Sequence, residues 1–562
     1  MQTFPWHAKY PEGVRPEVPV QDFETLVDLI DNGLKKYADR PAFENMGKVM
    51  TYADIDKLSA DFASYLQNVA GLKKGDRIAI QMPNLLQFPI AMFGALRAGM
   101  TVVNTNPLYT AREMEHQFND SGATAIVVVS LYAAELQKIV KNTKIKTIIV
   151  TDLGDMMSGI KRPIVNFVVK NVRKMVPAYS LPTAIKFNDV LKQGAKGSYK
   201  KADLTKEDFV FLQYTGGTTG VSKGAALRHR NLVAHAAMIE EWFKPHLNGQ
   251  QEQMITAIPM YHIFALSVNC LFMLNIGAKN ILVTNPRDLP GFIKELSKHK
   301  FTLMTGVNTL FNALINHADI GKVDFSSMKA CIGGGMAVQR AVAEKWKNLT
   351  GVALVEGYGL SETSPVLCCN PLDGTERTGT IGLPVPNTEI KIMNEKGEEV
   401  PNGEPGELCA RGPQVFTGYY ERPDETAKCF FDDWFRTGDI AVMEDDGFFK
   451  IVDRKKDMIL VSGFNVYPNE VEDAIATHPK VLEVAAIGVP NEKSTEVVKV
   501  FVVKKDDSLT EEELIAHCRE NMTGYKVPKH VEWKDELPKS NVGKILRRVL
   551  KEEEKAKSGV PA

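Results

Sequence analysis

The residues best suited to chemistry form a glycine- and hydroxyl-rich segment, Tyr214–Gly224, that follows the apolar run Phe209–Leu212. Glycines let backbone N–H groups approach phosphate oxygens closely, hydroxyl groups add donors, and Lys223 adds a positive charge. A flexible surface loop is the alternative, because glycine-rich motifs produce false positives. The density of hydroxyl groups beside a lysine favours phosphate binding, with candidate contacts from Tyr214, Thr215, Gly216, Gly217, Thr218, Thr219, Gly220 and Lys223.

This segment does not have the pattern of a Walker A loop. That loop needs a serine or threonine directly after its lysine, where the hydroxyl group binds Mg²⁺. Here Ser222 precedes Lys223, and Gly224 follows it. A motor or switch NTPase of the P-loop class is therefore not expected.

Further candidate residues follow in order along the chain. They are Gly333-Gly334-Gly335, then Glu356-Gly357-Tyr358-Gly359-Leu360-Ser361-Glu362, then Thr437-Gly438-Asp439 with Arg454, and finally Gly543-Lys544. Taken singly, each has a structural explanation. Glu362 fits a solvated surface, Asp439 after Thr-Gly fits a turn, and Lys544 lies in a stretch rich in other bases. Tyr358 alone would fit the core. The occurrence of all these motifs in this order in one chain favours a functional explanation over the structural ones.

In this order the motifs resemble those of the adenylate-forming (ANL) superfamily, which includes acyl-CoA synthetases, firefly luciferase and the adenylation domains of peptide synthetases. Three small departures occur: Gly216 stands where serine is usual, Ser222 where proline is usual, and Ser361 where threonine is commoner. The resemblance runs from the phosphate loop to Lys544, and a looser similarity covers nearly the whole chain.

The resemblance implies a role for each motif. Gly333–Gly335 borders the adenine, Tyr358 packs on it, and Asp439 with Arg454 binds the ribose. Thr215 and Glu362 bind Mg²⁺, and Lys544 is the catalytic lysine. The set of candidate nucleotide contacts also includes Glu356, Gly357, Gly359 and Ser361.

These residue types suit the activation of a carboxylic acid. A carboxylate is a poor electrophile, so it must acquire a leaving group before a thiol can attack it. Attack on the α-phosphate of ATP gives an acyl-AMP and pyrophosphate, and two anions must meet for this to happen. Cations are needed at that point, and Mg²⁺ and Lys544 would supply them.

The identity of the acid is suggested by a longer signature, Asp433–Asp439 continuing through Gly447–Met458. It resembles that of fatty acyl-CoA synthetases, especially bacterial long-chain ones, so we expect ATP, CoA and a long-chain fatty acid as substrates. Medium-chain or aryl acids with the same mechanism remain open, as does transfer of the acyl group to a carrier protein. A non-catalytic fatty-acid-binding or uptake module is the alternative from another class.

Four residues receive more specific expectations. His262 lies among apolar residues, which also fits a buried core histidine. The resemblance places its segment beside the acyl site, where His262 would orient the carboxylate and Phe264 would line the pocket. It also implies that Lys456 is the hinge between domains and that Gly463 lies on the face presented to CoA.

The elements that must position these residues alternate between short apolar runs and helical periodicity, as in Arg77–Met82, Asp54–Gln67 and Ala125–Val129. This alternation predicts layered α/β sheets. Around Gly397–Gly412 the pattern changes to turns and short strands, which indicates a small β unit, barrel-like in form. A compact α+β block then follows, with a helix expected near Asn469–Thr477, strands near Glu483–Val489 and Val497–Val503, and a helix from Thr510, which forms a capping box with Glu513. We expect an N-terminal adenylation and acyl-binding domain at residues 1–454, and a mobile C-terminal domain carrying the catalytic lysine at residues 455–562.

The bulk composition limits the other partners. The net charge of −1 argues against nucleic acid. The odd number of cysteines without a CxxC pair, and the absence of a signal peptide or an 18-residue apolar run, indicate a cytoplasmic protein. From Met156 to Asn188 there are bases but no Asp or Glu. Ile164–Val176 is thus either an interfacial helix on the inner membrane face or a basic helix packed on the domain. A homodimer is a further expectation.

Overall fold

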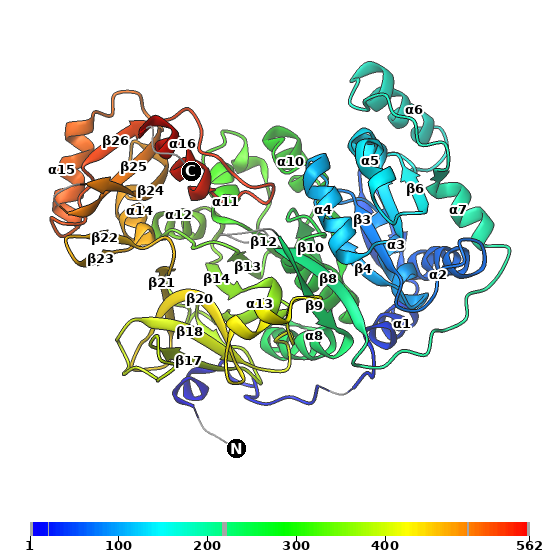
Figure 1. The fold of residues 1–562 in the computed structure, drawn as a ribbon, viewed down its shortest axis with the longest axis horizontal. Helices are drawn as coiled ribbons and strands as arrows, with labels where there is room; N and C mark the ends of the chain where they lie inside the picture. Colours follow the sequence, from blue (N-terminus) through cyan, green and yellow to red (C-terminus); the bar gives the residue numbers. More distant parts are fainter. Residues whose placement is uncertain (1–3, 21, 216–221, 492–493, 559–562) are drawn as a thin grey trace.

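The computed structural model describes residues 4–20, 22–215, 222–491 and 494–558. Figure 1 shows two large sheets with their helices, a smaller β unit below them, and a C-terminal domain to one side. This arrangement confirms the expected fold class: a large α/β region, a small β unit and a small α+β domain.

The first sheet has seven strands in the order β7-β6-β5-β3-β4-β8-β9. They are β3 (Arg77–Gln81), β4 (Thr101–Asn104), β5 (Ala125–Val129), β6 (Thr147–Thr151), β7 (Ile185–Lys186), β8 (Phe209–Thr215) and β9 (Lys223–Arg228). The pairs are parallel except for the antiparallel β8–β9 pair, in which β8 ends at Thr215 and β9 begins at Lys223. Parallel strands that are covered on both faces need apolar side chains at every position, which explains the sequence Ala-Ile-Val-Val-Val of β5.

The second sheet has nine strands in the order β16-β15-β14-β13-β12-β10-β11-β1-β2. They are β1 (Pro41–Asn45), β2 (Lys48–Thr51), β10 (Gln253–Thr256), β11 (Lys279–Leu282), β12 (Leu303–Gly306), β13 (Ala330–Gly334), β14 (Leu354–Gly359), β15 (Val366–Cys369) and β16 (Leu383–Pro384). Its middle strands are parallel, so β13 and β14 end side by side. This brings the glycine triplet and the Glu356–Glu362 motif to one edge.

Helix α3 (Gln87–Arg97) is buried along its whole length and packs on α2 (Tyr52–Asn68). Because α3 has no face to water, its last residue, Arg97, is also buried. Arg97 is neutralised by Asp31 at 2.7 Å and Asp56 at 2.5 Å. Other helices of this region are α1 (Leu26–Lys36), α4 (Ala111–Ser121), α5 (Ala133–Ile139), α7 (Phe187–Gly194) and α8 (His229–Phe243).

The β unit is an antiparallel sheet of five strands. They are β17 (Glu389–Met393), β18 (Gly406–Arg411), β19 (Phe430–Phe431), β20 (Trp434–Met443) and β21 (Phe449–Arg454). The short helix α13 (Pro423–Lys428) precedes β19. The next strand of the chain belongs to a different sheet, so the sheet membership changes just after Arg454.

The C-terminal domain has its own five-stranded sheet and its own apolar core. Its elements are β22 (Ile459–Val461), β23 (Phe464–Val466), α14 (Pro468–Ala476), β24 (Val481–Asn491), β25 (Thr495–Lys504), α15 (Glu511–Asn521), β26 (His530–Trp533) and α16 (Arg547–Ser558). The four elements expected here from the sequence, near 469–477, 483–489, 497–503 and from 510, correspond to α14, β24, β25 and α15.

The C-terminal domain touches the second sheet's helices α11 (Asn308–Ile315) and α12 (Arg340–Thr350). Thr309 Oγ1 donates to the carbonyl of Gly543 at 2.8 Å, and Asn312 Nδ2 donates to the carbonyl of Leu482 at 2.8 Å. These bonds hold the turn that precedes Lys544 against the larger domain.

A buried ion pair also spans the junction. Asp453, at the end of β21, is 0% exposed, and Arg547 of α16 reaches it at 3.3 Å. Arg547 also donates to Glu472 at 2.7 Å and to Asn469 at 2.6 Å. The pair therefore connects the last strand before Lys456 to the first helix after Lys544.

Candidate active site

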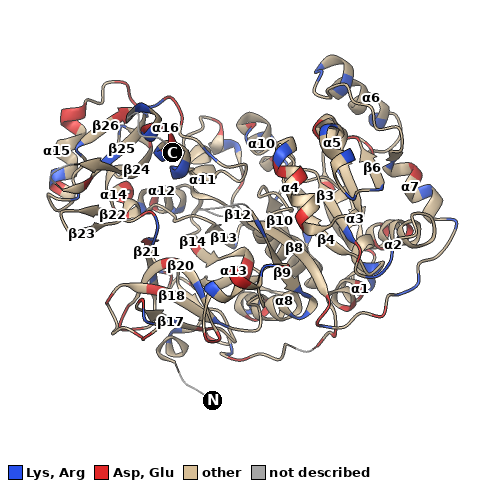
Figure 2. Cartoon of the chain, viewed as in Figure 1, with Lys and Arg blue, Asp and Glu red and all other residues tan. Residues whose placement is uncertain are grey.

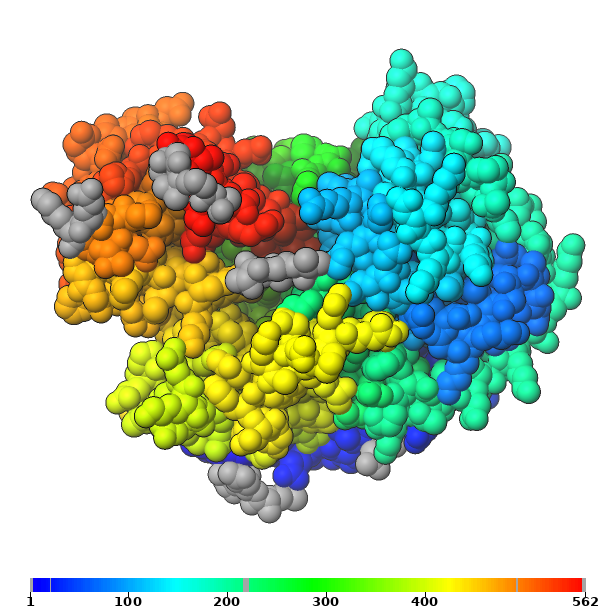
Figure 3. Space-filling view, viewed as in Figure 1, coloured from blue at the N-terminus to red at the C-terminus, as the bar shows by residue number. Residues whose placement is uncertain are grey.

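One large cleft, of about 1940 Å³, lies between the two domains. Figure 3 shows the red and orange C-terminal domain, the yellow β unit and the blue-to-cyan region meeting at this face. The cleft is lined by most of the residues predicted from the sequence: Tyr214, Thr215, Lys223, His262, Phe264, Gly334, Gly335, Glu356, Gly357, Tyr358, Gly359, Ser361, Glu362, Asp439, Arg454, Lys456 and Lys544.

Two predicted residues, Gly333 and Gly463, are not among the residues lining this cleft. Gly216, Gly217, Thr218, Thr219 and Gly220 lie outside the described residues. Gly463 lies in the turn between β22 and β23, exposed and with a positive φ of 86°.

The glycine triplet makes room for other groups. A β-carbon on Gly333 would lie 2.5 Å from a methyl carbon of Val338, and one on Gly334 would lie 2.9 Å from the ring of Phe264. After the triplet, the backbone N–H of Val338 donates to Glu356 at 3.2 Å, and burial raises the pKa of Glu356 to about 8. Glu356 thus braces the backbone that follows the triplet.

At the end of the cleft predicted to bind the ribose, two strands and a tyrosine meet. Asp439 of β20 and Arg454 of β21 are cross-strand partners, and the Arg454 Nε lies 3.5 Å from Asp439 Oδ1. The hydroxyl of Tyr358 donates to Asp439 Oδ2 at 2.6 Å. Burial raises the pKa of Asp439, and Arg454 acts against that rise. The result is a buried, fixed carboxylate able to accept bonds from vicinal hydroxyl groups.

At the end of the cleft predicted to bind phosphates, the β8–β9 register places Thr215 directly opposite Lys223. The Lys223 ammonium pairs with Glu425 of α13 at 2.5 Å and lies 4.8 Å from the ring centroid of Tyr419. The hydroxyl of Tyr214 donates to Asp120 at 2.7 Å. A hydroxyl and a cation thus flank the segment predicted to bind phosphates.

Glu362 lies in the turn Ser361–Thr363 after β14, which contacts β8. It is 6% exposed, and its Oε1 accepts a bond from the Tyr419 hydroxyl at 2.7 Å. Burial raises the pKa of Glu362, and the bond from Tyr419 acts against that rise.

The catalytic-lysine candidate points into the cleft from the C-terminal domain. The backbone N–H of Lys544 donates to the Ser540 hydroxyl at 3.1 Å, and the Ser540 N–H donates to the carbonyl of Lys544 at 2.7 Å. Burial lowers the pKa of Lys544 to about 8; Arg454 acts in the same direction, while Asp439 and Glu362 oppose it. Lys544 is therefore mostly protonated at neutral pH and brings a positive charge to the cleft that Asp439 and Glu362 also line.

His262 lines the cleft beside an apolar wall. Burial lowers the pKa of His262 to about 3, so the imidazole is neutral at neutral pH. The wall comes from α8, the π-helical segment Ala265–Phe272, β13 and β15, through Ile239, Phe243, Val268, Ile332, Val366 and Cys369. Such a wall can accept an aliphatic chain.

Sequence reasoning missed Tyr419, Glu425 and Asp120. Tyr419 lies 57 residues from Glu362 in the chain, and Glu425 lies 202 residues from Lys223. The sequence around Tyr419, Gly418-Tyr419-Tyr420, contains no motif that indicates a contact with a residue so far away in the chain.

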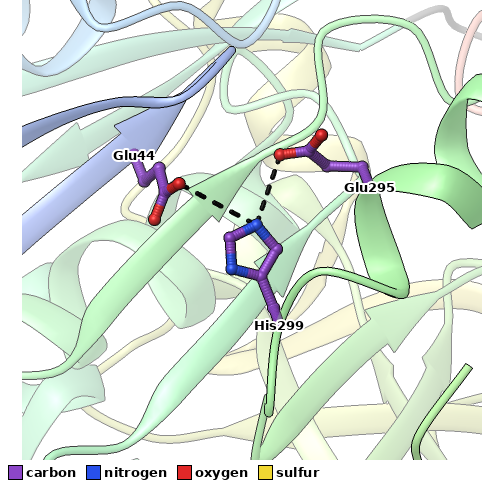
Figure 4. A group of neighbouring side chains, drawn as sticks. All are labelled: Glu44, Glu295 and His299. Atoms are coloured by element: carbon purple, nitrogen blue, oxygen red, sulfur yellow. Dashed lines mark hydrogen bonds and ion pairs between the residues drawn. The ribbon is translucent and has the colours of Figure 1, made fainter.

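A separate cluster joins His299 to two carboxylates (Figure 4). His299 Nε2 lies 3.3 Å from Glu295 Oε1 and 3.9 Å from Glu44 Oε1. Lys279 pairs with Glu44 at 3.1 Å and Lys298 pairs with Glu295 at 2.5 Å. Because two lysines already neutralise these carboxylates, we interpret the cluster as an ion-pair network that connects β1 to α10 (Leu289–Leu296).

The basic segment forms α6 (Lys161–Phe167) and a π-helical turn, Val168–Val172, at the outer end of the first sheet (Figures 1 and 2). No side chain of these two elements is buried. Phe167 is 60% exposed and Val172 64% exposed, beside Lys170. Within the described residues, no helix is both long and apolar enough to cross a bilayer.

The chain belongs to the AMP-binding enzyme family, which matches residues 30–420; the C-terminal domain of AMP-binding enzymes matches residues 470–544. It is 56% identical to long-chain-fatty-acid–CoA ligases of Escherichia coli O6:H1 and of Yersinia pestis, with 98% of each chain covered. The crystal structure of the anthranilate CoA ligase AuaEII in complex with anthranoyl-AMP has the same fold, with a TM-score of 0.85 at 24% identity over 97% of this chain and 100% of that one.

Proposed function

We propose that this protein is an AMP-forming long-chain fatty acid–CoA ligase. The observation that carries the proposal is the 56% identity to such ligases over 98% of the chain. The cleft, which combines the residues predicted to bind phosphates and ribose with an apolar wall, supports that activity. The substrates are ATP, CoA and a fatty acid, and the reaction proceeds in two half-reactions.

In the first half-reaction, a carboxylate oxygen of the acid attacks the α-phosphorus of ATP. The bond between the α-phosphorus and the bridging oxygen breaks, and pyrophosphate leaves with that oxygen. Asp439 and Arg454 hold the ribose, and Tyr358 fixes Asp439 through its hydroxyl. Lys544 lines the same cleft as Asp439 and Glu362, and its positive charge would offset the charge of the two approaching anions.

Mg²⁺ is part of the proposal, with Glu362 and Thr215 as the residues that would hold it. A carboxylate and a hydroxyl group are hard oxygen donors of the kind that Mg²⁺ prefers. Glu362 is buried in a position where burial disfavours its charge, which a bound cation would restore. When bound, the metal would supply positive charge to the phosphate oxygens.

The acyl chain would lie along the apolar wall beyond His262, towards Phe243 of α8. Each buried CH₂ contributes roughly 0.8 kcal/mol, so a long chain gains more from this wall than a short one. Neutral His262 can accept or donate one hydrogen bond at the carboxyl end without adding a second charge beside Lys544.

In the second half-reaction, the CoA thiolate attacks the acyl carbonyl carbon, and AMP leaves with the bridging oxygen. Lys544 occupies the cleft in the present arrangement, so the C-terminal domain, residues 455–562, would have to move before the thiol enters. Lys456 lies between β21 and β22, where few residues can absorb the rotation. The exposed turn at Gly463 would then face CoA.

A fatty acid that comes from the membrane would be most accessible to an enzyme in contact with it. We include in the proposal a cytoplasmic enzyme that touches the inner membrane face through α6 and the π-helical turn after it. Phe167 of α6 and Val172 of the turn, both exposed, would enter the interface, while Lys161, Lys170 and Lys174 would meet anionic lipid. A homodimer also stays a proposal, to be tested by sedimentation velocity.

The experiment that tests the function measures two readouts with purified protein. ATP–pyrophosphate exchange should depend on palmitate, and acyl-CoA should form only when CoA is added. A panel of medium-chain and aryl acids separates the close alternatives, and a carrier-protein thiol tests the other acceptor. Loss of exchange with every acid would leave the non-catalytic binding module as the better explanation.

A further inference from the structure

Tyr419 contacts both of the oppositely charged groups at the phosphate end. Its hydroxyl donates to Glu362 Oε1 at 2.7 Å. Its ring lies under the Lys223 ammonium, which is 4.8 Å from the ring centroid. One side chain therefore connects the predicted metal-binding carboxylate to the predicted phosphate-binding cation.

The backbone around Tyr419 is held from several sides. Its N–H donates to the Thr426 hydroxyl oxygen at 3.0 Å, and Tyr419 forms an antiparallel bridge with Ala225 of β9. Its ring also packs edge-on against Phe416, with ring centroids 5.0 Å apart. These contacts come from β9, from α13 and from the region before α13. The backbone of Tyr419 is therefore fixed relative to β9, the strand that begins with Lys223.

The surroundings keep the phenol in its donor form. The hydroxyl of Tyr419 is the donor of its bond to the buried Glu362, because an ionised carboxylate can only accept. A protonated phenol bonded to a buried carboxylate fixes the direction of that carboxylate. An ammonium over an aromatic face is stabilised without loss of its charge.

We propose that Tyr419 is a positioning residue for adenylation: its hydroxyl holds Glu362 in the orientation that receives the metal, and its ring holds Lys223 beside the nucleotide phosphates. This inference rests on the proposed function. The two parts of the side chain have different roles: the hydroxyl acts through Glu362, and the ring acts through Lys223.

Two variants test these roles, because the hydroxyl can be removed alone or together with the ring. Tyr419→Phe keeps the ring and removes the hydroxyl, whereas Tyr419→Leu removes both. Tyr420→Phe is the matched control, because it removes a phenol hydroxyl from the neighbouring residue, which packs edge-on against Phe209 with ring centroids 6.0 Å apart. A melting curve for each variant establishes that it is folded.

The first readout is the affinity for ATP, measured by calorimetry with and without Mg²⁺, which requires no turnover. Tyr419→Phe should weaken ATP binding about tenfold in the presence of Mg²⁺ and leave the metal-free affinity within about twofold of the wild type, as expected for one hydrogen bond to a charged group. Tyr419→Leu should weaken the metal-free affinity as well, because Lys223 loses its ring contact.

The second readout is ATP–pyrophosphate exchange with palmitate, titrated with Mg²⁺. Tyr419→Phe should need about tenfold more Mg²⁺ for half-maximal exchange, whereas Tyr420→Phe should not. If Tyr419→Phe matches Tyr420→Phe in both readouts, the positioning role is overturned. A wild-type protein that binds Mg²⁺–ATP but exchanges no pyrophosphate with any acid would instead overturn the proposed function, and the binding comparison would still decide the role of Tyr419.

Discussion

Lys544 occupies space that Gly335 leaves open. A β-carbon on Gly335 would lie 3.0 Å from the Lys544 Cε and 3.4 Å from its Nζ, and Gly335 has a positive φ of 77°. The two residues come from different domains, and the Lys544 side chain occupies the space that a side chain at position 335 would need.

Gly335→Ala should therefore displace Lys544 and lower the adenylation rate by roughly tenfold or more, as expected when a preorganised charge is shifted. Gly351→Ala is the matched control, since Gly351 has a similar φ of 75° and a β-carbon there would have no other group within 4 Å. ATP–pyrophosphate exchange measures the effect. Equal losses in both variants would assign the effect to backbone strain.

Removing the lysine and fixing the hinge should have opposite effects on the two half-reactions. Lys544→Ala should abolish acyl-AMP formation but still convert supplied acyl-AMP and CoA to acyl-CoA. Lys456→Pro fixes φ at the proposed hinge, so it should retain adenylation and lose thioester formation. Each half-reaction is measured separately in a single turnover. If both folded variants lose both steps equally, the domain-movement proposal is wrong.

The pH profile of adenylation should follow Lys544. Burial lowers the pKa of this lysine to about 8, and its positive charge is present below that value and lost above it. The kcat/KM for ATP should thus be constant near neutral pH and fall about tenfold per pH unit above about 8, since kcat/KM reports the free enzyme. In Lys544→Arg the guanidinium stays charged, so a descending limb that persists in that variant would belong to another group.

Glu425 should compete with the nucleotide for Lys223. The two side chains pair at 2.5 Å, and Lys223 and Lys428 hold the pKa of Glu425 at about 2. Because phosphate must replace this carboxylate, Glu425→Gln should tighten binding of ATP by up to about fivefold, the range of an exposed ion pair. Asp424→Asn removes the same charge from the neighbouring position of α13 and serves as the control. Calorimetry with ATP decides between them, and equal tightening would indicate only a general charge effect.

Membrane contact through α6 and the π-helical turn after it should depend on their exposed apolar residues. Replacing Phe167 and Val172 with Ser should weaken co-sedimentation with anionic vesicles about tenfold and leave turnover of a water-soluble acid unchanged. Leu349→Ser, which removes an exposed leucine from α12, is the control. Binding to neutral vesicles separates the apolar contribution from the charge. Unchanged sedimentation would leave α6 as a surface helix.

Much of the fold could be predicted because its signals are local. The apolar run Ala125–Val129 is β5 without any shift in its ends, since a parallel strand covered on both faces needs apolar side chains throughout. The capping sequence Thr510-x-x-Glu513 marked the start of α15, where the Thr510 hydroxyl accepts the Glu513 N–H. The expected N-terminal domain ends at residue 454, which is the last residue of β21, and the next strand, β22, belongs to another sheet.

The contacts that complete the cleft could not be predicted in the same way. Glu362, Asp439 and Lys544 were found through motifs, but Tyr419 depends on a pairing of β9 with a distant segment, as the Ala225–Tyr419 bridge shows. Long-range pairing leaves no periodic pattern in either partner. The conformation of the C-terminal domain, which decides that Lys544 faces the cleft and Gly463 does not, is likewise a property of tertiary contacts.

The Asp453–Arg547 pair gives the junction a particular energetic character. Asp453 precedes Lys456 and Arg547 follows Lys544, so a rotation at Lys456 would separate them and expose both to water. Hydration then compensates for much of the lost attraction, because buried ion pairs and hydrated ions are often close in free energy. Two arrangements of similar free energy respond strongly to small differences in bound ligand. The exchange of ATP for acyl-AMP and the departure of pyrophosphate would therefore be sufficient to select which of the two domain arrangements is populated.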